Sequence, residues 1–236
     1  MMAAALLACI AAARADDAFR LLQIDGHIVK WGTPVLGQGA TISYAVINGP
    51  SKIKGSVNCL HVTGIEALLA RSQLTRRSFD HELAAALTMW QSAANIRFVV
   101  AKRAAKADIV FAAEAQPDGI GYADVALAAT GERNVTRLRR GIVCLNPALR
   151  WSAAPGSDAG AQESDPGLHL RYALAHEIGH VLGLDHPGPK GELMSFEYGS
   201  GFSGLKPGDM AGIAMLYGRR SPVPVLALAS RSPAVR

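Results

Sequence analysis

The sequence predicts an α+β fold in which helices pack in a layer against a sheet. Short stretches rich in β-branched and aromatic residues recur between positions 41 and 145, one strong helical pattern interrupts them, and a second follows. The chain has 236 residues, of which 50% are hydrophobic, and it shows no internal repeat. A chain of this kind can bury one good-sized core, with two lobes around a cleft.

The first predicted elements are one strand and two helices. Residues 41–47, TISYAVI, alternate in polarity and end at the turn Asn48-Gly49-Pro50, which predicts a strand. A short helix is predicted over 62–74. The next helix is expected to begin at Ser78, whose hydroxyl is a suitable N-cap. Its apolar face is formed by residues three or four apart: Leu83, Leu87, Trp90 and Ala94.

The remaining sheet precedes two further helices. Strands are predicted at 97–100, 108–111, 119–123 and 142–145. The glycines of the third of these favour an irregular or edge strand. A polar loop over 152–167 leads into the second strong helix, 168–184. The last helix is predicted from Pro207 to Tyr217, because proline suits a first helical turn and Gly218 follows its end.

The first fifteen residues resemble a secretory signal peptide. They are almost wholly small and apolar and end in Ala13-Arg14-Ala15, a pattern typical of signal cleavage. A secreted or periplasmic location is therefore expected. Leu6 to Cys9 also resembles a lipoprotein box, so that anchoring at Cys9 is the alternative. No later stretch reaches the length of a transmembrane helix, and stable membrane insertion is not expected.

Charge and cysteine content limit the classes of partner and compartment. The formal net charge of +5 is spread along the chain, and basic pairs such as Arg139-Arg140 have no interleaved aromatic residues. A solvated surface is predicted there, and nucleic acid is not expected as a partner. Beyond the signal, Cys59 and Cys144 form an even pair, which permits one disulfide in an exported protein. Two unpaired buried thiols are the alternative.

The eleven residues HEIGHVLGLDH, numbered 176–186, contain three of the seven histidines of the chain. Residues four apart share one face of a helix, so His176 and His180 can bind one ion together. Glu177 lies beside them, within reach of a water on that ion. Gly183 can end the helix in a left-handed conformation and let the chain return with His186 as a third ligand.

This arrangement predicts one catalytic zinc ion. Three protein ligands leave one coordination position open for water, which is the pattern of catalytic rather than structural zinc. Zinc lowers the pKa of its bound water toward about 7. Glu177 is then the predicted general base, because it needs to accept only a weakly held proton.

The pattern HExxHxxGxxH, followed by Met194, resembles the zinc-binding signature of the metzincin endopeptidases. Within that clan, residues 172–186 and 206–218 are most similar to the matrixins, the matrix-metalloproteinase type. The resemblance implies a mixed twisted sheet, an active-site helix, a C-terminal helix and a zinc cleft between upper and lower subdomains. It also implies that Met194 supports the metal site from below.

The same resemblance implies where a substrate binds. Tyr198 matches the matrixin tyrosine that helps wall the primed-side specificity pocket, the pocket for the side chain that follows the cleaved bond. Gly121 and Tyr122 belong to a stretch that resembles the edge strand on which matrixins lay an extended substrate. A protein or peptide substrate is therefore expected.

Several departures from the family pattern are visible. His186-Pro187-Gly188 looks more like the serralysins, although Phe196 stands where their turn carries a tyrosine. Gly/Asp-rich calcium loops and the histidines of a structural zinc are not recognised, so calcium is not supported. No cysteine-bearing pro-segment is recognised either, and a separate protein inhibitor is left open as the restraint on activity.

The domain division follows from these features. Residues 1–15 are predicted to be the signal peptide, 16–38 an N-terminal segment without a cysteine-switch prodomain, 39–219 the metzincin catalytic domain and 220–236 a flexible tail. The predicted function is that of a secreted zinc-dependent endopeptidase, a hydrolase that uses a zinc-bound water and Glu177. The alternatives are a zinc-bound binding module without turnover, or a zinc amidase acting on a non-protein, cell-wall amide.

Overall fold

The computed structural model describes residues 18–128, 134–153, 168–188, 191–197 and 203–220. The predicted signal peptide, Cys9, Tyr198 and nearly all of the predicted tail lie outside these described residues. Within them, no helix has the length and apolar character that a bilayer crossing needs.

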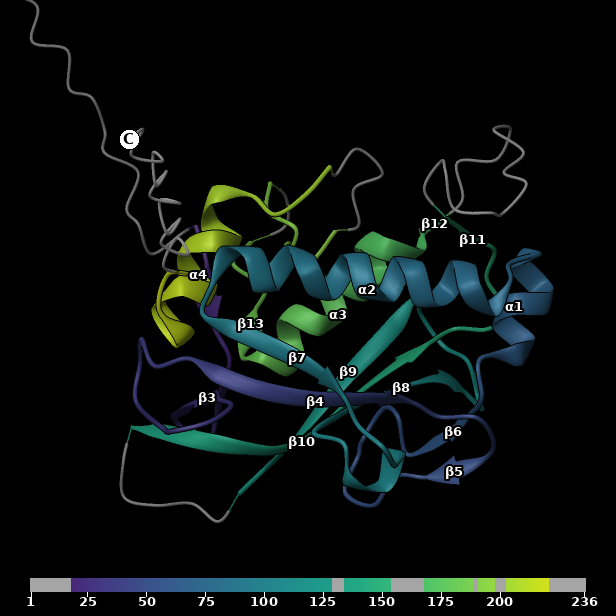
Figure 1. Ribbon diagram of the computed structural model, residues 1–236, viewed down its shortest axis with the longest axis horizontal. Helices are drawn as coiled ribbons and strands as arrows, with labels where there is room; N and C mark the ends of the chain where they lie inside the picture. The colour runs from purple at the N-terminus through teal and green to yellow at the C-terminus, as the bar shows by residue number, and fades with distance from the viewer. Residues whose placement is uncertain (1–17, 129–133, 154–167, 189–190, 198–202, 221–236) are drawn as a thin grey trace, which may run out of the picture.

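The fold is an α+β layer structure, and its described residues form a nine-stranded mixed sheet (Figure 1). The central path of the sheet runs β2-β3-β10-β8-β4-β7, β6 joins β8, β5 joins β6, and β9 pairs with β10. Most pairs on the central path are parallel, whereas β9 is antiparallel to β10. The strands of this sheet are β2 (Gln23–Ile24), β3 (His27–Lys30), β4 (Ala40–Val46), β5 (Ser51–Lys52), β6 (His61–Thr63), β7 (Ile96–Val100), β8 (Ile109–Glu114), β9 (Gly121–Leu127) and β10 (Val135–Leu145).

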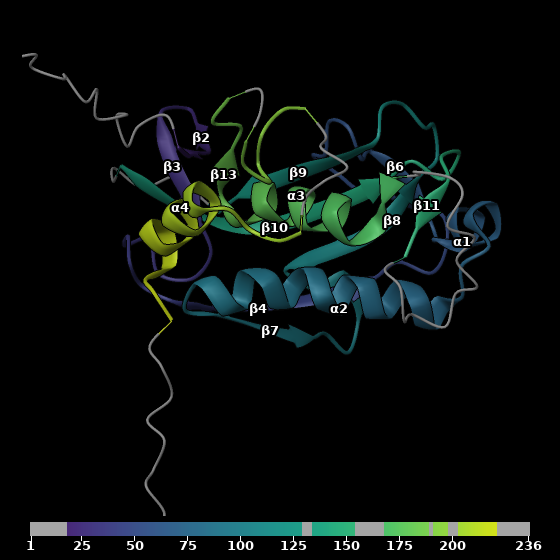
Figure 2. The ribbon, with the colours of Figure 1, turned by 90° about the horizontal axis from the view of Figure 1, so that it is seen from above.

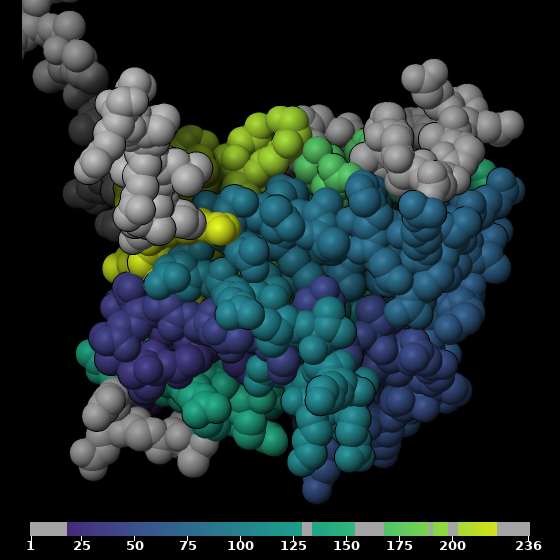
Figure 3. All heavy atoms as spheres, in the orientation of Figure 1, coloured from purple at the N-terminus to yellow at the C-terminus, as the bar shows by residue number. Residues whose placement is uncertain are grey.

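Within the described residues, four helices and a short 3-10 turn accompany the sheet. They are α1 (Glu66–Ser72), α2 (Arg76–Ala93), α3 (Leu170–Leu182), α4 (Pro207–Tyr217) and the turn η2 (Ala104–Lys106). The helices α2 and α3 run side by side over one face of the sheet (Figures 1 and 2). In the space-filling view, α2 forms the upper part of the visible face above the strands β4 and β7 (Figure 3). The main apolar core lies between this helical layer and the sheet.

Two helix boundaries differ from the sequence prediction. Ser78 is not the N-cap of α2, because Thr75 precedes the helix and its hydroxyl oxygen accepts a hydrogen bond from the Ser78 amide at 3.0 Å. The helix predicted over 62–74 is shorter, since His61–Thr63 pairs with β8 as a strand before α1 begins. Long-range strand pairing therefore overrides the local helical tendency of those residues.

The N-terminal segment is packed into the same domain. The strand β1 (Arg20–Leu21) pairs antiparallel with β13 (Leu184–Asp185), the short strand that follows α3. β3 joins the main sheet, and Val29 and Trp31 are buried in the main core. Residues 18–38 therefore support the segment that leads from α3 to His186.

A disulfide joins Cys59 to Cys144 across the second, smaller apolar cluster. Both cysteines are fully buried, and their Cα atoms lie 5.9 Å apart. Of the two states left open by the sequence, the bridged one is therefore present. The bond fastens the 53–60 loop to β10 on the face of the sheet opposite α3.

Candidate active site

The helix α3 carries two histidines on one face and ends at Gly183. It follows β12 (Leu168–His169), which pairs with β11 (Trp151–Ser152). Gly183 has φ +105°, a left-handed conformation, and a Cβ at this position would lie 2.2 Å from the Val29 carbonyl oxygen. Only glycine fits both the conformation and this approach. The chain therefore turns sharply there and brings His186 back toward α3, as the sequence predicts.

The three predicted histidines converge on one point. The Nε2 atoms of His176 and His186 are 3.1 Å apart, and the Nε2 atom of His180 lies 3.2 Å and 3.1 Å from them. Tetrahedral ligands about 2.05 Å from a zinc ion lie roughly 3.3 Å from one another. This His176–His180–His186 group is therefore compatible with a zinc site.

Backbone carbonyl groups orient two of these rings. The Nδ1 atom of His176 lies 2.7 Å from the Leu193 carbonyl oxygen, and the Nδ1 atom of His180 lies 2.9 Å from that of Leu184. A carbonyl oxygen can only accept, so both Nδ1 atoms carry the ring proton. Both Nε2 atoms are then lone-pair acceptors, and their contacts with each other cannot be hydrogen bonds. Two imidazole lone pairs directed at one point are the arrangement found in metal sites, where the other ring nitrogen donates to a second group.

Burial keeps these rings neutral. It lowers the pKa of His176 to about 4 and that of His180 to about 3, with the neighbouring histidines adding to the effect. The pKa of His186 is lowered as well, again mainly by burial. Neutral imidazole is the form that binds metal, so the ligand set is available without deprotonation at neutral pH.

Glu177 is nearly fully buried, with 9% of its surface exposed, and lines the same cavity as the histidines. Burial raises its pKa to about 8, and the charge of Glu114 adds to the shift. Glu114 is itself buried at the end of β8, and burial raises its pKa too. A cation held by the histidines acts in the opposite direction, because positive charge favours the carboxylate.

Met194 lies under the histidine-bearing part of α3. A Cβ on Gly179 would lie 2.2 Å from the Met194 sulfur and 2.9 Å from the Trp90 ring, so the helix, the methionine and α2 are in close contact. The turn at Met194 is held by Asp209, whose carboxylate accepts hydrogen bonds from the backbone N–H groups of Leu193, Met194 and Lys206 at 2.8–3.0 Å. Asp209 therefore links this turn to the first turn of α4.

The histidines open into a cleft of about 440 Å³. One wall is the start of β9, where Gly121, Tyr122 and Ala123 face the cavity. Among the described strands, β9 pairs only with β10, so its other edge is free for an added strand. Phe196 is 74% exposed and contacts His186 edge to face, with ring centroids 5.4 Å apart.

The structure brings together most of the predicted site residues and adds others. His176, Glu177, His180 and His186 share the cleft with Gly121 and Tyr122, while Met194 lies beneath it. Tyr198 lies outside the described residues. The sequence reasoning missed the roles of Leu22, which lines the cleft, and of Asp209. For Asp209 the available signal was its place in the first turn of a helix that begins with proline.

Comparisons with known proteins agree with this geometry. The matrixin family model matches residues 66–218. Matrix metalloproteinase-19 of Mus musculus is 48% identical over 58 residues, which are 24% of this chain and 11% of that protein. Matrilysin of Mus musculus is 41% identical over 61 residues, 24% of this chain and 23% of that protein. Stromelysin-3 of Homo sapiens is 40% identical over 72 residues, 30% of this chain and 14% of that protein. The matches thus span less than a quarter of each relative.

Proposed function

The chain belongs to the matrixin family of peptidases, and from this premise we propose that it is a zinc-dependent endopeptidase that acts on extended protein or peptide substrates. The observation that carries the proposal is the convergence of three imidazole Nε2 atoms within 3.2 Å of one another. Two of them are oriented by carbonyl groups that leave only lone pairs facing inward.

His176, His180 and His186 are the residues that would hold the ion. Zinc at this position supplies a Lewis acid that polarises the scissile carbonyl group and acidifies a water molecule. The open side of the histidine group faces the cleft that β9 lines, so a bound peptide carbonyl can approach from there.

Glu177 is the proposed general base and later the general acid. It lines the cleft beside the histidines, and its burial excludes bulk water from its carboxylate. It takes one proton from the attacking water and returns that proton to the leaving amine. A cation held by the histidines favours the ionised form of this carboxyl that the first step needs.

The substrate is proposed to bind as an added strand on β9. Backbone groups at the free edge from Gly121 to Ala123 would pair with an extended peptide. Phe196 and Leu22 stand at the cleft as apolar contacts for its side chains. Tyr198 is proposed, from the resemblance alone, to wall the primed-side pocket, and Met194 to support the metal site without taking part in the chemistry.

Export is part of the proposal. The apolar stretch before Asp16 resembles a signal peptide, and the Cys59–Cys144 disulfide is of a kind that persists in oxidising compartments. Mass spectrometry of the protein from its native compartment should find Asp16 as the first residue. An N-terminus retaining the first fifteen residues would contradict export by this signal.

The test of the proposed activity compares wild type with Glu177→Ala. Both proteins should contain one zinc ion by metal analysis, since this residue is not among the ligands. The rate at which the variant cleaves a quenched peptide library should be roughly 10²–10⁴-fold lower than that of wild type, as expected for a lost general base. Activity within tenfold of wild type would remove the assignment. Zinc in both proteins with cleavage by neither would favour a binding module, and hydrolysis of cell-wall amides alone would favour the amidase.

A further inference from the structure

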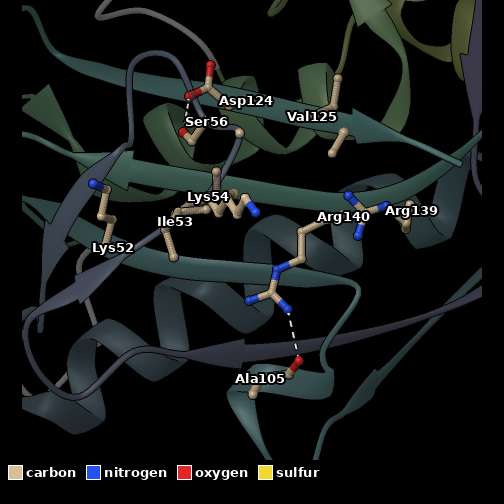
Figure 4. Close-up of a pocket in the computed structure, with 12 residues that line it drawn as sticks. Lys52, Ile53, Lys54, Ser56, Ala105, Asp124, Val125, Arg139 and Arg140 are labelled. Atoms are coloured by element: carbon tan, nitrogen blue, oxygen red, sulfur yellow. Dashed lines mark hydrogen bonds between the residues drawn. The ribbon is translucent and has the colours of Figure 1, made fainter.

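A second hollow, of about 270 Å³, lies on the face of the sheet opposite α3, and it shares no residue with the catalytic cleft. The 53–56 loop, β9, β10 and the η2 turn form its walls (Figure 4). Four basic side chains line it: Lys52, Lys54, Arg139 and Arg140. We call this feature the basic hollow.

A β-bulge places both arginines in the basic hollow. Successive side chains of a regular strand point to opposite faces of a sheet. The pairing of β10 with β9 shifts between Leu138 and Arg140, so Arg139 is an extra residue in β10. The bulge re-aims the side chains around it. Arg139 and Arg140 therefore both line the same hollow instead of facing opposite sides.

Three backbone carbonyl groups hold the Arg140 guanidinium in place. Its Nη1 donates to the carbonyl oxygens of Ala105 and Ala107 at 3.2 and 3.3 Å, and its Nη2 donates to that of Ala104 at 3.3 Å. These contacts occupy three of its five N–H groups. Its Nε–H has no hydrogen-bond partner among the described residues. That N–H group can donate to an oxyanion that enters the hollow.

The other basic groups are also without an acidic partner among the described residues. Arg139 donates from Nε to the Leu127 carbonyl oxygen at 3.3 Å, which leaves its terminal nitrogens available. Figure 4 shows Lys54 extending toward the arginines, while Lys52 lies at the far side of the loop. No described carboxylate forms an ion pair with any of these four side chains.

Among the described residues, Asp124 is the only carboxylate that lines the basic hollow, and its oxygens already accept several hydrogen bonds. Asp124 accepts hydrogen bonds from the backbone N–H groups of Val57, Asn58 and Cys59 at 2.8–3.0 Å. It also bonds the side chains of Ser56 and Asn58. Asp108, which immediately precedes β8 and whose charge acts on Arg140, accepts hydrogen bonds from the Ser43 amide and hydroxyl at 2.7 Å. Four basic side chains and one carboxylate thus line the basic hollow, which gives its lining a formal charge of +3.

We propose that the basic hollow binds a tetrahedral oxyanion, a sulfate or phosphate group, through Arg139, Arg140 and Lys54. The positive charges of these side chains repel one another, and an anion between them removes that repulsion. The anion also accepts hydrogen bonds from the N–H groups that have no other partner. The group can be a free ion or a sulfate ester on an anionic polysaccharide, in which case Lys52 extends the contact along the loop. Binding through several esters would be tighter, because each adds an intramolecular contact.

The test measures binding to the full chain by isothermal titration calorimetry. Sodium sulfate and sodium phosphate are titrated against sodium chloride at equal ionic strength, and dextran sulfate against neutral dextran of the same length. Free sulfate should bind with Kd on the order of 1 mM or tighter. Dextran sulfate binding tenfold or more tightly would identify the ester as the source, and equal affinity per sulfate would identify the free ion.

The decisive variant replaces two exposed cations of the basic hollow, Lys54→Gln with Arg139→Gln. Its matched control, Arg71→Gln with Arg97→Gln, removes the same charge from exposed sites outside the hollow. The first pair should weaken sulfate binding at least tenfold and the control less than twofold, with peptidase activity and thermal unfolding unchanged in both. If the double variant fails to fold, sulfate binding is measured with each single substitution instead.

Three outcomes would overturn the proposal. They are the absence of binding by wild type, an equal loss in the control pair, and tighter binding of a single-stranded oligonucleotide than of dextran sulfate at equal charge. Since binding is measured without any substrate, failure here leaves the proposed peptidase activity untouched. Loss of cleavage by Glu177→Ala likewise says nothing about the basic hollow.

Discussion

Gly183 offers the sharpest test of how the third histidine is positioned. Its φ of +105° disfavours any residue with a Cβ, and that Cβ would lie 2.2 Å from the Val29 carbonyl oxygen. Left-handed backbone costs an alanine about 1–2 kcal/mol, and overpacking against a backbone atom costs about 1–3 kcal/mol more. Val29 cannot retreat easily, because it belongs to β3 within the sheet. Gly183→Ala should therefore destabilise the fold by roughly 2–5 kcal/mol.

The assay combines thermal unfolding with zinc affinity from competition with a chelator. For a domain of this size the loss corresponds to a decrease in Tm of roughly 5–20 °C. Zinc affinity should fall as well, because relief of the clash displaces the segment that carries His186. Gly188→Ala is the matched control, since a Cβ there meets nothing within 4 Å and its φ is not in the left-handed range. A Tm and zinc affinity equal to those of the control would refute the reasoning.

Three further substitutions probe the supports of the site. Asp209→Ala should lower the free energy of unfolding in urea by roughly 2–5 kcal/mol and lower the zinc content, because it removes the hydrogen-bond acceptor of the buried turn at Met194. An unchanged urea midpoint would contradict this. Replacing Cys59 and Cys144 by alanine should cost roughly 2–5 kcal/mol, since the bond closes a loop of 85 residues, and equal urea midpoints for wild type and variant would argue against it. Lys30 is fully buried, and burial lowers its pKa from 10.5 to about 8. Between about pH 8 and pH 10.5 this lysine therefore carries a proton in the unfolded chain but not in the folded one. The stability of wild type relative to Lys30→Met should then rise by roughly 3 kcal/mol from pH 7 to pH 10.5, and a flat difference would exclude the shift.

The sequence predicted the elements whose signals are local. The helices α2, α3 and α4, the turn at Gly183 and the convergence of three histidines all follow from spacing within short stretches. The glycines at 119 and 121 predicted an irregular or edge strand, and β9 pairs with β10 alone among the described strands. In each case the residues that interact lie close together along the chain.

Features that depend on distant partners could not be predicted in this way. The pairing of β1 with β13 joins residues 163 and 165 positions apart, and nothing in Arg20 or Leu21 indicates it. The disulfide remained one of two alternatives, since only the fold brings Cys59 to Cys144. The pair Arg139-Arg140 was expected to be an ordinary solvated surface, because a bulge depends on the register of the neighbouring strand.

The short ladder between β1 and β13 has a consequence for the rate at which a bound ion leaves. His186 follows β13 directly, and the ladder is small: two residue pairs and one hydrogen bond from the Leu22 amide to the Gly183 carbonyl oxygen at 2.8 Å. So small a unit opens locally far more often than the whole domain unfolds. The rate at which the ion exchanges with solution should therefore depend on how often β1 opens locally. The stability of the main core should not set that rate.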